Sequence, residues 1–168
     1  MRKIIISVML STLLLGMTSC KLTPTQIEVI ANTVGMFSAV SWIAIDNPPT
    51  PVKVSVNAVV NVIKDSAKLV QVGETYSEVL YPIAVKIIDK EVEIQYRPLC
   101  KTGVSMMLGQ LDILFAAHPE WKKDQDIALM IVVAFCDGVH QGLALSDDSP
   151  IIIQAKKNAA MRLAILGK

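Results

Sequence analysis

The chain has 168 residues, the size of a single domain, and its 16 Lys and Arg nearly balance its 15 Asp and Glu. Hydrophobic residues make up 52% of the chain and charged residues only 18%, so there is enough apolar surface to bury a large core. The charge balance and the lack of a basic–aromatic surface pattern argue against a nucleic-acid partner.

The first 20 residues have the pattern of an export signal. Arg2 and Lys3 precede an apolar run from Ile4 to Leu15, and small residues follow before Cys20. An apolar run of about 12 residues is too short to cross a bilayer, but it is typical of the hydrophobic region of a cleaved signal. We therefore predict that residues 1–19 form a signal peptide.

A cysteine at the cleavage site makes this prediction more specific. The segment Met17-Thr18-Ser19-Cys20 resembles the lipobox of bacterial lipoprotein precursors, although Met17 stands where that family usually has leucine. The resemblance implies that Cys20 receives fatty acyl chains and anchors the protein to a membrane of the bacterial envelope. Lys21 replaces the aspartate that favours inner-membrane retention in enterobacterial relatives, so it points to the outer membrane. An ordinary cleaved signal and an uncleaved anchor are the alternatives.

Residues 20–25 are then a lipidated tether, and residues 26–168 a helical domain. Gln26–Asp46 has apolar residues at helical spacing on nearly every face, and the proline-rich segment 47–51 ends that helix. Val52–Val72 also fits a helix, with Lys53, Asn57 and Lys64 off its apolar stripe. Gly73 follows where a glycine commonly ends a helix.

The segment Ile83–Tyr96 fits two structures. Val92, Ile94 and Tyr96 alternate with polar residues as in a strand, whereas the residues before them favour a helix that Pro82 interrupts or restarts. No other segment offers a convincing partner strand, and a lone strand would leave its backbone hydrogen bonds unpaired. We therefore expect a helix.

Three further helices are predicted on the C-terminal side of this segment, over 102–117, 126–145 and 151–166. A polar connection with a half-buried Trp121 separates the first two, and Ser149-Pro150 is a typical start for the third. The sequence therefore predicts an all-α bundle of about five or six helices.

Cys100 and Cys136 remain once Cys20 is assigned to lipid. An even pair of cysteines in a chain exported to an oxidising compartment favours a disulfide between them. The alternative is two buried free thiols, because cysteine is among the most buried residue types.

Cys136 and His140 are four residues apart, so they share one face of a helix, as a thiolate–base pair or two metal ligands would. A cysteine in a disulfide cannot serve as a nucleophile, and a zinc site built from Cys100, His118, Cys136 and His140 lacks the paired-ligand spacing of known sites. No phosphate-binding loop and no gathered carboxylates stand out. We therefore predict no catalytic residue, no metal and no cofactor.

The C-terminal segment 151–168 contains four cations and no acid, and an apolar stripe runs along its other side. It could be a basic amphipathic helix that lies on an anionic membrane or a partner, or simply the last bundle helix with a solvated cationic face. The second interpretation is the simpler one. The cations are Lys156, Lys157, Arg162 and Lys168, and the stripe is Ile152, Ala155, Ala159, Leu163 and Leu166.

Together these features predict a non-enzymatic envelope lipoprotein that binds a protein partner or maintains the envelope. One alternative is a membrane-inserting protein that uses Ile27–Ile45 and Ile127–Leu145, although Glu28, Asp137 and His140 would be costly in lipid. Another is an envelope enzyme without a recognisable site. A phage or prophage origin also fits a small solitary lipoprotein, and no residue tests it.

Overall fold

The computed structural model describes residues 22–71 and 73–166, so the predicted signal peptide and Cys20 lie outside the described residues. Within those ranges the chain forms six α-helices and three short 3₁₀ helices, and no strand. The prediction of an all-α bundle is confirmed. The α-helices are α2 Pro24–Asp46, α3 Thr50–Ser66, α4 Tyr76–Glu91, α5 Arg97–Ala117, α6 Gln125–Ala144 and α7 Pro150–Leu166; the 3₁₀ helices are η1 Ala67–Leu69, η2 Ile94–Tyr96 and η3 Trp121–Lys123.

Side chains cap the starts of most helices, as the sequence indicates. Thr23 and Thr75 each form a reciprocal capping box with the Gln or Glu three residues later, and Asp124 accepts from the first backbone N–H groups of α6. Ser149 Oγ accepts from Ile152 N at 3.2 Å at the start of α7. These caps satisfy backbone donors that would otherwise have no partner within the helix.

Some boundaries differ from the predicted ones. In the ambiguous segment Ile83–Tyr96, α4 passes Pro82 and continues to Glu91, and the alternating residues after it form η2 rather than a strand. Helix α5 begins at Arg97, earlier than predicted, because Pro98 is well suited to a first helical turn. Helix α3 ends at Ser66, earlier than predicted, and Gly73 adopts its positive φ of 102° in the loop that follows η1.

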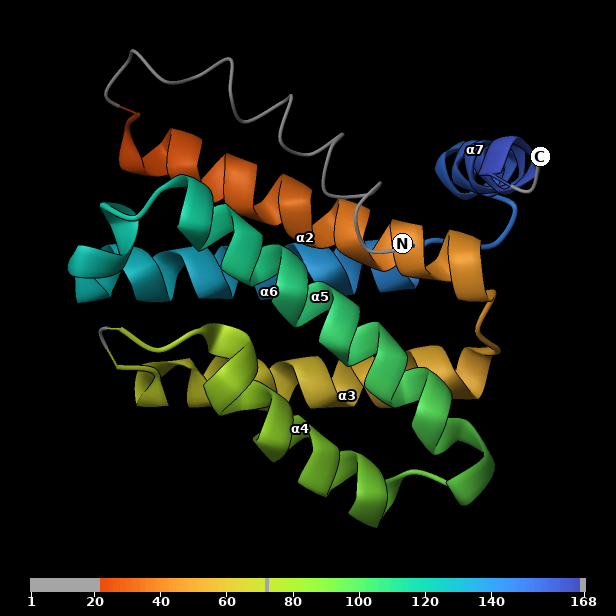
Figure 1. Cartoon of the computed structure of the whole chain (residues 1–168), viewed down its shortest axis with the longest axis horizontal. Helices are drawn as coiled ribbons and strands as arrows, with labels where there is room; N and C mark the ends of the chain where they lie inside the picture. Colours follow the sequence, from red (N-terminus) through yellow and green to blue (C-terminus); the bar gives the residue numbers. More distant parts are fainter. Residues whose placement is uncertain (1–21, 72, 167–168) are drawn as a thin grey trace.

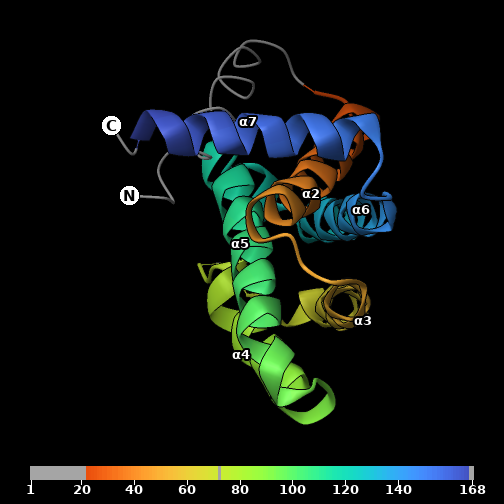
Figure 2. The same ribbon diagram turned by 90° about the vertical axis from the view of Figure 1, so that its right-hand side faces the viewer.

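Helix α6 lies between α2 and α3, and α5 crosses the bundle against α2, α3 and α4 (Figure 1). Helix α4 forms the edge of the bundle beyond α3, and α7 crosses over α2 at the opposite edge (Figure 2). Helices α2 and α6 run in the same direction, whereas α3 runs against α6. The domain is thus built around one central helix, α6, with α2 on one side and α3 on the other.

Helices α2 and α6 make backbone contact along a seam of small residues. A Cβ added to Gly35 would lie 2.0 Å from the Phe135 carbonyl oxygen, and one added to Gly138 would lie 1.9 Å from that of Asn32. Only glycine leaves room for a backbone at such distances. The seam consists of residues spaced by four on each helix: Ala31, Gly35 and Ala39 on α2, and Ala134, Gly138 and Gly142 on α6.

The other face of α2 is joined to α5 by a buried tryptophan. The Trp42 side chain is fully buried, and a Cβ added to Gly103 of α5 would lie only 2.6 Å from its ring. The large ring therefore fits because the opposing helix has a glycine, which is the dense interlocking expected of a protein interior.

Three helical stretches in the described residues are long and apolar enough to cross a membrane, namely α2, residues 94–117 and α6. About half of the residues in each are buried inside the bundle. Their apolar character therefore serves, at least in part, to form the core.

We expect Gly138→Ala to weaken the fold strongly, because the new methyl group would meet the backbone of α2. Overpacking of this kind costs about 1–3 kcal/mol and more when backbone must move. Urea unfolding followed by circular dichroism measures the loss.

Gly109→Ala in α5 is the matched control, because a Cβ there meets nothing within 4 Å. Alanine favours a helix over glycine by up to about 1 kcal/mol, so this variant should be as stable as the parent or more so. Equal stability of the parent and Gly138→Ala would contradict the backbone contact.

Candidate functional site

Polar side chains gather where α3 meets α6. Lys64 Nζ lies 2.6 Å from Asp137 Oδ1, and one helical turn further along α6 the ring nitrogen Nδ1 of His140 is hydrogen-bonded to Asn57 Oδ1. We call Asn57, Lys64, Asp137 and His140 the α3–α6 cluster. It brings together an imidazole, a carboxylate and an ammonium from two helices, so it is a candidate site for chemistry.

Two groups in this cluster, Lys64 and His140, have shifted pKa values. The hydrogen bond that Lys64 donates to Asp137 raises the pKa of Lys64, so the ammonium stays protonated at neutral pH. Desolvation lowers the pKa of His140 and outweighs the opposite effect of Asp137. The imidazole is therefore neutral at pH 7, with Nδ1–H donating to Asn57 Oδ1.

The second ring nitrogen of His140, Nε2, is buried and has no hydrogen-bond partner among the described residues. A buried acceptor without a partner costs free energy, so this side chain is held in place by packing and by Asn57 rather than by a full set of hydrogen bonds.

Cys136 adjoins Asp137 of the cluster, but the cluster does not activate its thiol as a nucleophile. Burial raises the pKa of its thiol to about 12, and the positive charge of Lys64 only partly opposes that effect. The thiolate–base pair that was weighed and set aside would need a hydrogen bond between Cys136 and His140, and within the described ranges His140 Nδ1 pairs with Asn57 instead. A protonated, buried thiol is a poor nucleophile.

The predicted disulfide between Cys100 and Cys136 is not formed. Both residues are buried and both are free thiols, as in the alternative interpretation. Cys100 lies in the first turn of α5, whereas Cys136 lies in the middle of α6. These two helices make little direct contact with each other, since α2 and α3 lie against both of them, and the thiols stay unpaired.

The four residues weighed as a zinc site are not gathered either. His118 follows the last turn of α5 and Cys100 lies in its first turn, so about 27 Å of helix separates them. His118 instead stacks on Trp121, with ring centroids 3.8 Å apart, and its Nδ1 lies 3.2 Å from Glu120 Oε1. Trp121 is buried in this stack rather than half-buried as predicted. No group of three potential metal ligands exists in the part of the chain that the structure describes.

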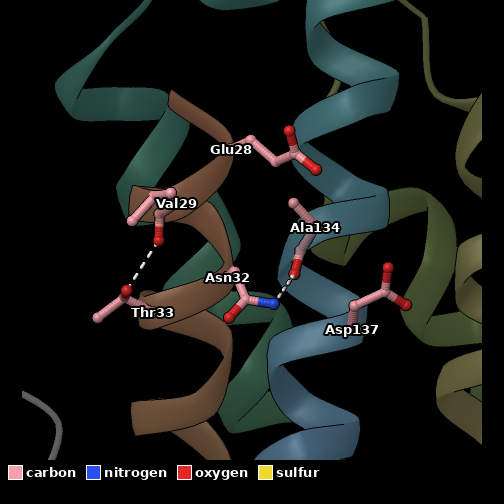
Figure 3. Close-up of a pocket in the computed structure, with 6 residues that line it drawn as sticks. All are labelled: Glu28, Val29, Asn32, Thr33, Ala134 and Asp137. Carbon is pink, nitrogen blue, oxygen red and sulfur yellow. Dashed lines mark hydrogen bonds between the residues drawn. The ribbon is translucent and has the colours of Figure 1, made fainter. Parts of the chain in front are cut away.

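A shallow hollow of about 340 Å³ lies beside the cluster, between α2 and α6 (Figure 3). Its polar side chains bond to nearby backbone: Asn32 Nδ2 donates to the Ala134 carbonyl at 3.3 Å, and Thr33 Oγ1 donates to that of Val29 at 2.7 Å. Glu28 and Asp137 also line it: the Glu28 side chain points toward α6, whereas the Asp137 carboxylate points away from α2 (Figure 3) and pairs with Lys64. Most of the polar side chains in the hollow therefore already have partners within the domain.

A second set of charges joins the start of α7 to α3. Lys53 Nζ lies 2.9 Å from Asp147 Oδ1, and Lys156 Nζ lies 3.8 Å from the same oxygen. The hydrogen bond from Lys53 lowers the pKa of the Asp147 carboxyl, which stays ionised. Lys53 itself is almost fully buried.

Neither set of charge pairs was predicted from the sequence. The helical pattern places Lys53, Asn57 and Lys64 off the apolar stripe of their helix, and in the fold that side contacts α6 and the segment after it. The spacing of seven between Asn57 and Lys64, and of three between Asp137 and His140, was the available signal, since each pair shares a helix face.

No protein-family model matches the chain, and no curated protein or solved structure matches it either. The chemistry of the site therefore has to be inferred from its own residues.

We expect the protein to lose stability as the pH falls below about 6.5, the ordinary pKa of histidine. The pKa of His140 is lower in the folded state, so the unfolded chain binds the proton more tightly, and protonation favours unfolding in the window between the two values. His140→Gln removes the titrating group and should flatten this part of the profile, which urea unfolding at a series of pH values measures.

Replacement of the other histidine, His118→Gln, is the control, because it leaves His140 in place. A profile that is equally steep in His140→Gln and in the parent would show that His140 is not responsible.

Proposed function

We propose that this chain is a non-enzymatic lipoprotein of the bacterial envelope, anchored through Cys20, whose helical domain binds a protein partner or maintains the envelope. The N-terminal sequence carries the proposal: Arg2 and Lys3, the apolar run, and Thr18-Ser19 directly before Cys20. Lys21 favours the outer membrane as the site of anchoring.

Acylation at Cys20 would hold the protein firmly. Each buried methylene contributes about 0.8 kcal/mol, so one chain gives only reversible binding and two or three give a stable anchor. The anchored residue lies close to the fold, since Thr23, the cap of α2, is three residues after Cys20.

The non-enzymatic part of the proposal is supported by what the reactive side chains do. Burial keeps the Cys136 thiol protonated, His140 bonds to Asn57, and Asp137 pairs with Lys64. Each of these groups has a structural partner or environment, which favours a domain that acts by binding.

We expect Cys20→Ser to abolish incorporation of a clickable fatty acid, because the acylated sulfur is gone. Cys100→Ser is the matched control: it also removes one thiol, but it leaves the lipobox intact and should be labelled like the parent. The measurement is metabolic labelling followed by gel fluorescence. Equal labelling of Cys20→Ser and the parent would refute the anchor.

A second candidate is insertion of the helices themselves into a membrane. Three stretches are long and apolar enough, and the α2–α6 seam is of the small-residue type that also joins helices in lipid. Against it, the ion pair between Lys64 and Asp137 is partly exposed on the bundle surface, with 31% and 45% of the two side chains accessible, and such charges are expensive in hydrocarbon.

A chain that begins at Lys21 separates the two candidates. The anchored-domain proposal predicts that it stays monodisperse in buffer without detergent and shows a predominantly helical circular dichroism spectrum. Insertion predicts that the same chain aggregates unless detergent is present, so strict dependence on detergent would favour the second candidate.

A further inference from the structure

Helix α7 is only partly packed against the rest of the domain. It crosses α2 and extends past the bundle (Figure 2). Ile152 in its first turn is fully buried, whereas Ala155 and Ala159, further along the predicted apolar stripe, are only partly buried. The stripe therefore anchors the start of α7 and leaves much of the helix accessible.

The face of α7 opposite Ile152 is not the polar face expected of a last bundle helix. Lys157, Met161 and Ile165 follow one another at intervals of four residues on this face. Met161 is 57% exposed and Ile165 is 73% exposed. Spaced by one helical turn, these two side chains form a small contiguous apolar patch, which is more informative than a single exposed apolar residue.

The outer face of α2 adds two more exposed apolar side chains. Val29 is 60% exposed and Phe37 is 46% exposed. Thr33, which lies between them on the same face, carries no charge. Glu28 points toward α6 while Val29 lies on the other side of α2 (Figure 3), so the acid does not interrupt this surface.

The start of α2 and helix α7 both lie on the side of the molecule away from α4 in the two views, toward opposite ends of the long axis (Figures 1 and 2). We call this surface, formed by Val29, Phe37, Lys157, Met161 and Ile165, the α2–α7 face. It combines exposed apolar side chains with a lysine at one edge of the domain.

We propose that the α2–α7 face rests on an anionic lipid surface, which orients the domain on the membrane. This inference rests on the proposed anchor at Cys20. Thr23 is three residues after Cys20, and an extended chain of that length spans only about 11 Å, so the first turn of α2 must lie at the membrane. The side of the domain away from α4, which includes both this turn and α7, is then the one that can rest on the lipid.

Charge favours lipid over another occupant. Residues 150–166 contain three cations and no Asp or Glu, which suits anionic headgroups, and Met161 and Ile165 can enter the boundary between headgroups and acyl chains. Lys157 is exposed and takes part in none of the ion pairs found in the described residues. A second copy of the chain would instead bring like charges together across the contact.

The test uses the full lipidated protein in phosphatidylcholine vesicles, with and without phosphatidylglycerol. The environment-sensitive dye NBD is attached at Met161→Cys. Residue 161 is exposed, so the new thiol is accessible, and labelling is selective because Cys100 and Cys136 are buried. We expect a several-fold rise and a blue shift of the NBD emission when phosphatidylglycerol is present. Adding Lys157→Glu should reduce that response.

Lys90→Cys on α4 carries the control dye, because its side chain is exposed at the edge away from the α2–α7 face. Its emission should stay water-like in both kinds of vesicle. The same water-like emission at residue 161, in protein whose Cys20 is shown to be acylated, would overturn this inference and leave the proposed anchor intact.

Two other results would also overturn it. A dye response at residue 161 that depends on protein concentration and not on phosphatidylglycerol would assign the face to a second copy of the chain. Protein with no acyl chain on Cys20 would refute the proposed function, and with it the short tether on which the inference rests.

Discussion

The parallel contact between α2 and α6 is the constraint on which the rest of the structure depends. Two helices about 100 residues apart in the chain meet backbone to backbone, with Gly35 against Phe135 and Gly138 against Asn32. Since no side chain separates them, the relative rotation and translation of the two helices are set within narrow limits. The intervening helices have to form a connection that brings α6 back beside α2 in the same direction.

Once α6 is placed against α2, its opposite face meets α3, and polar pairs fix that second contact. Proceeding backward along α3, Lys64 pairs with Asp137, Asn57 with His140 and Lys53 with Asp147, in the order required by antiparallel helices. Partly exposed ion pairs add little stability, about 0–1 kcal/mol each. They instead set the register of α3 against α6, because a shift of α3 by one helical turn along α6 would separate all of the partners at once.

The same arrangement gives the domain two unlike edges. Helix α4 lies at one edge, where Asp112 of α5 accepts hydrogen bonds from the first backbone N–H groups of α4 and so holds its start. The other edge contains the start of α2 and the exposed length of α7. A lipid on Cys20 would act at this second edge, since the tether before Thr23 is so short.

The sequence alone determined the helices and most of their ends, because those depend on neighbouring residues. The break at Asn47-Pro48-Pro49 and the start at Ser149-Pro150 follow from local hydrogen bonding and backbone sterics. The all-α class followed from the helical spacing of apolar residues and from the lack of a partner for any strand at Val92–Tyr96.

Only the tertiary structure decided which surfaces meet. Counting cysteines favoured a disulfide, but α5 and α6 make little direct contact with each other, and the thiols stay free. The helical pattern placed Asn57 and Lys64 off the apolar stripe without a partner, and the face of α7 opposite Ile152 looked merely cationic, until the positions of α6 and α2 were known. Periodicity shows which residues share a face of one helix, whereas the partner of that face depends on contacts between segments far apart in the chain.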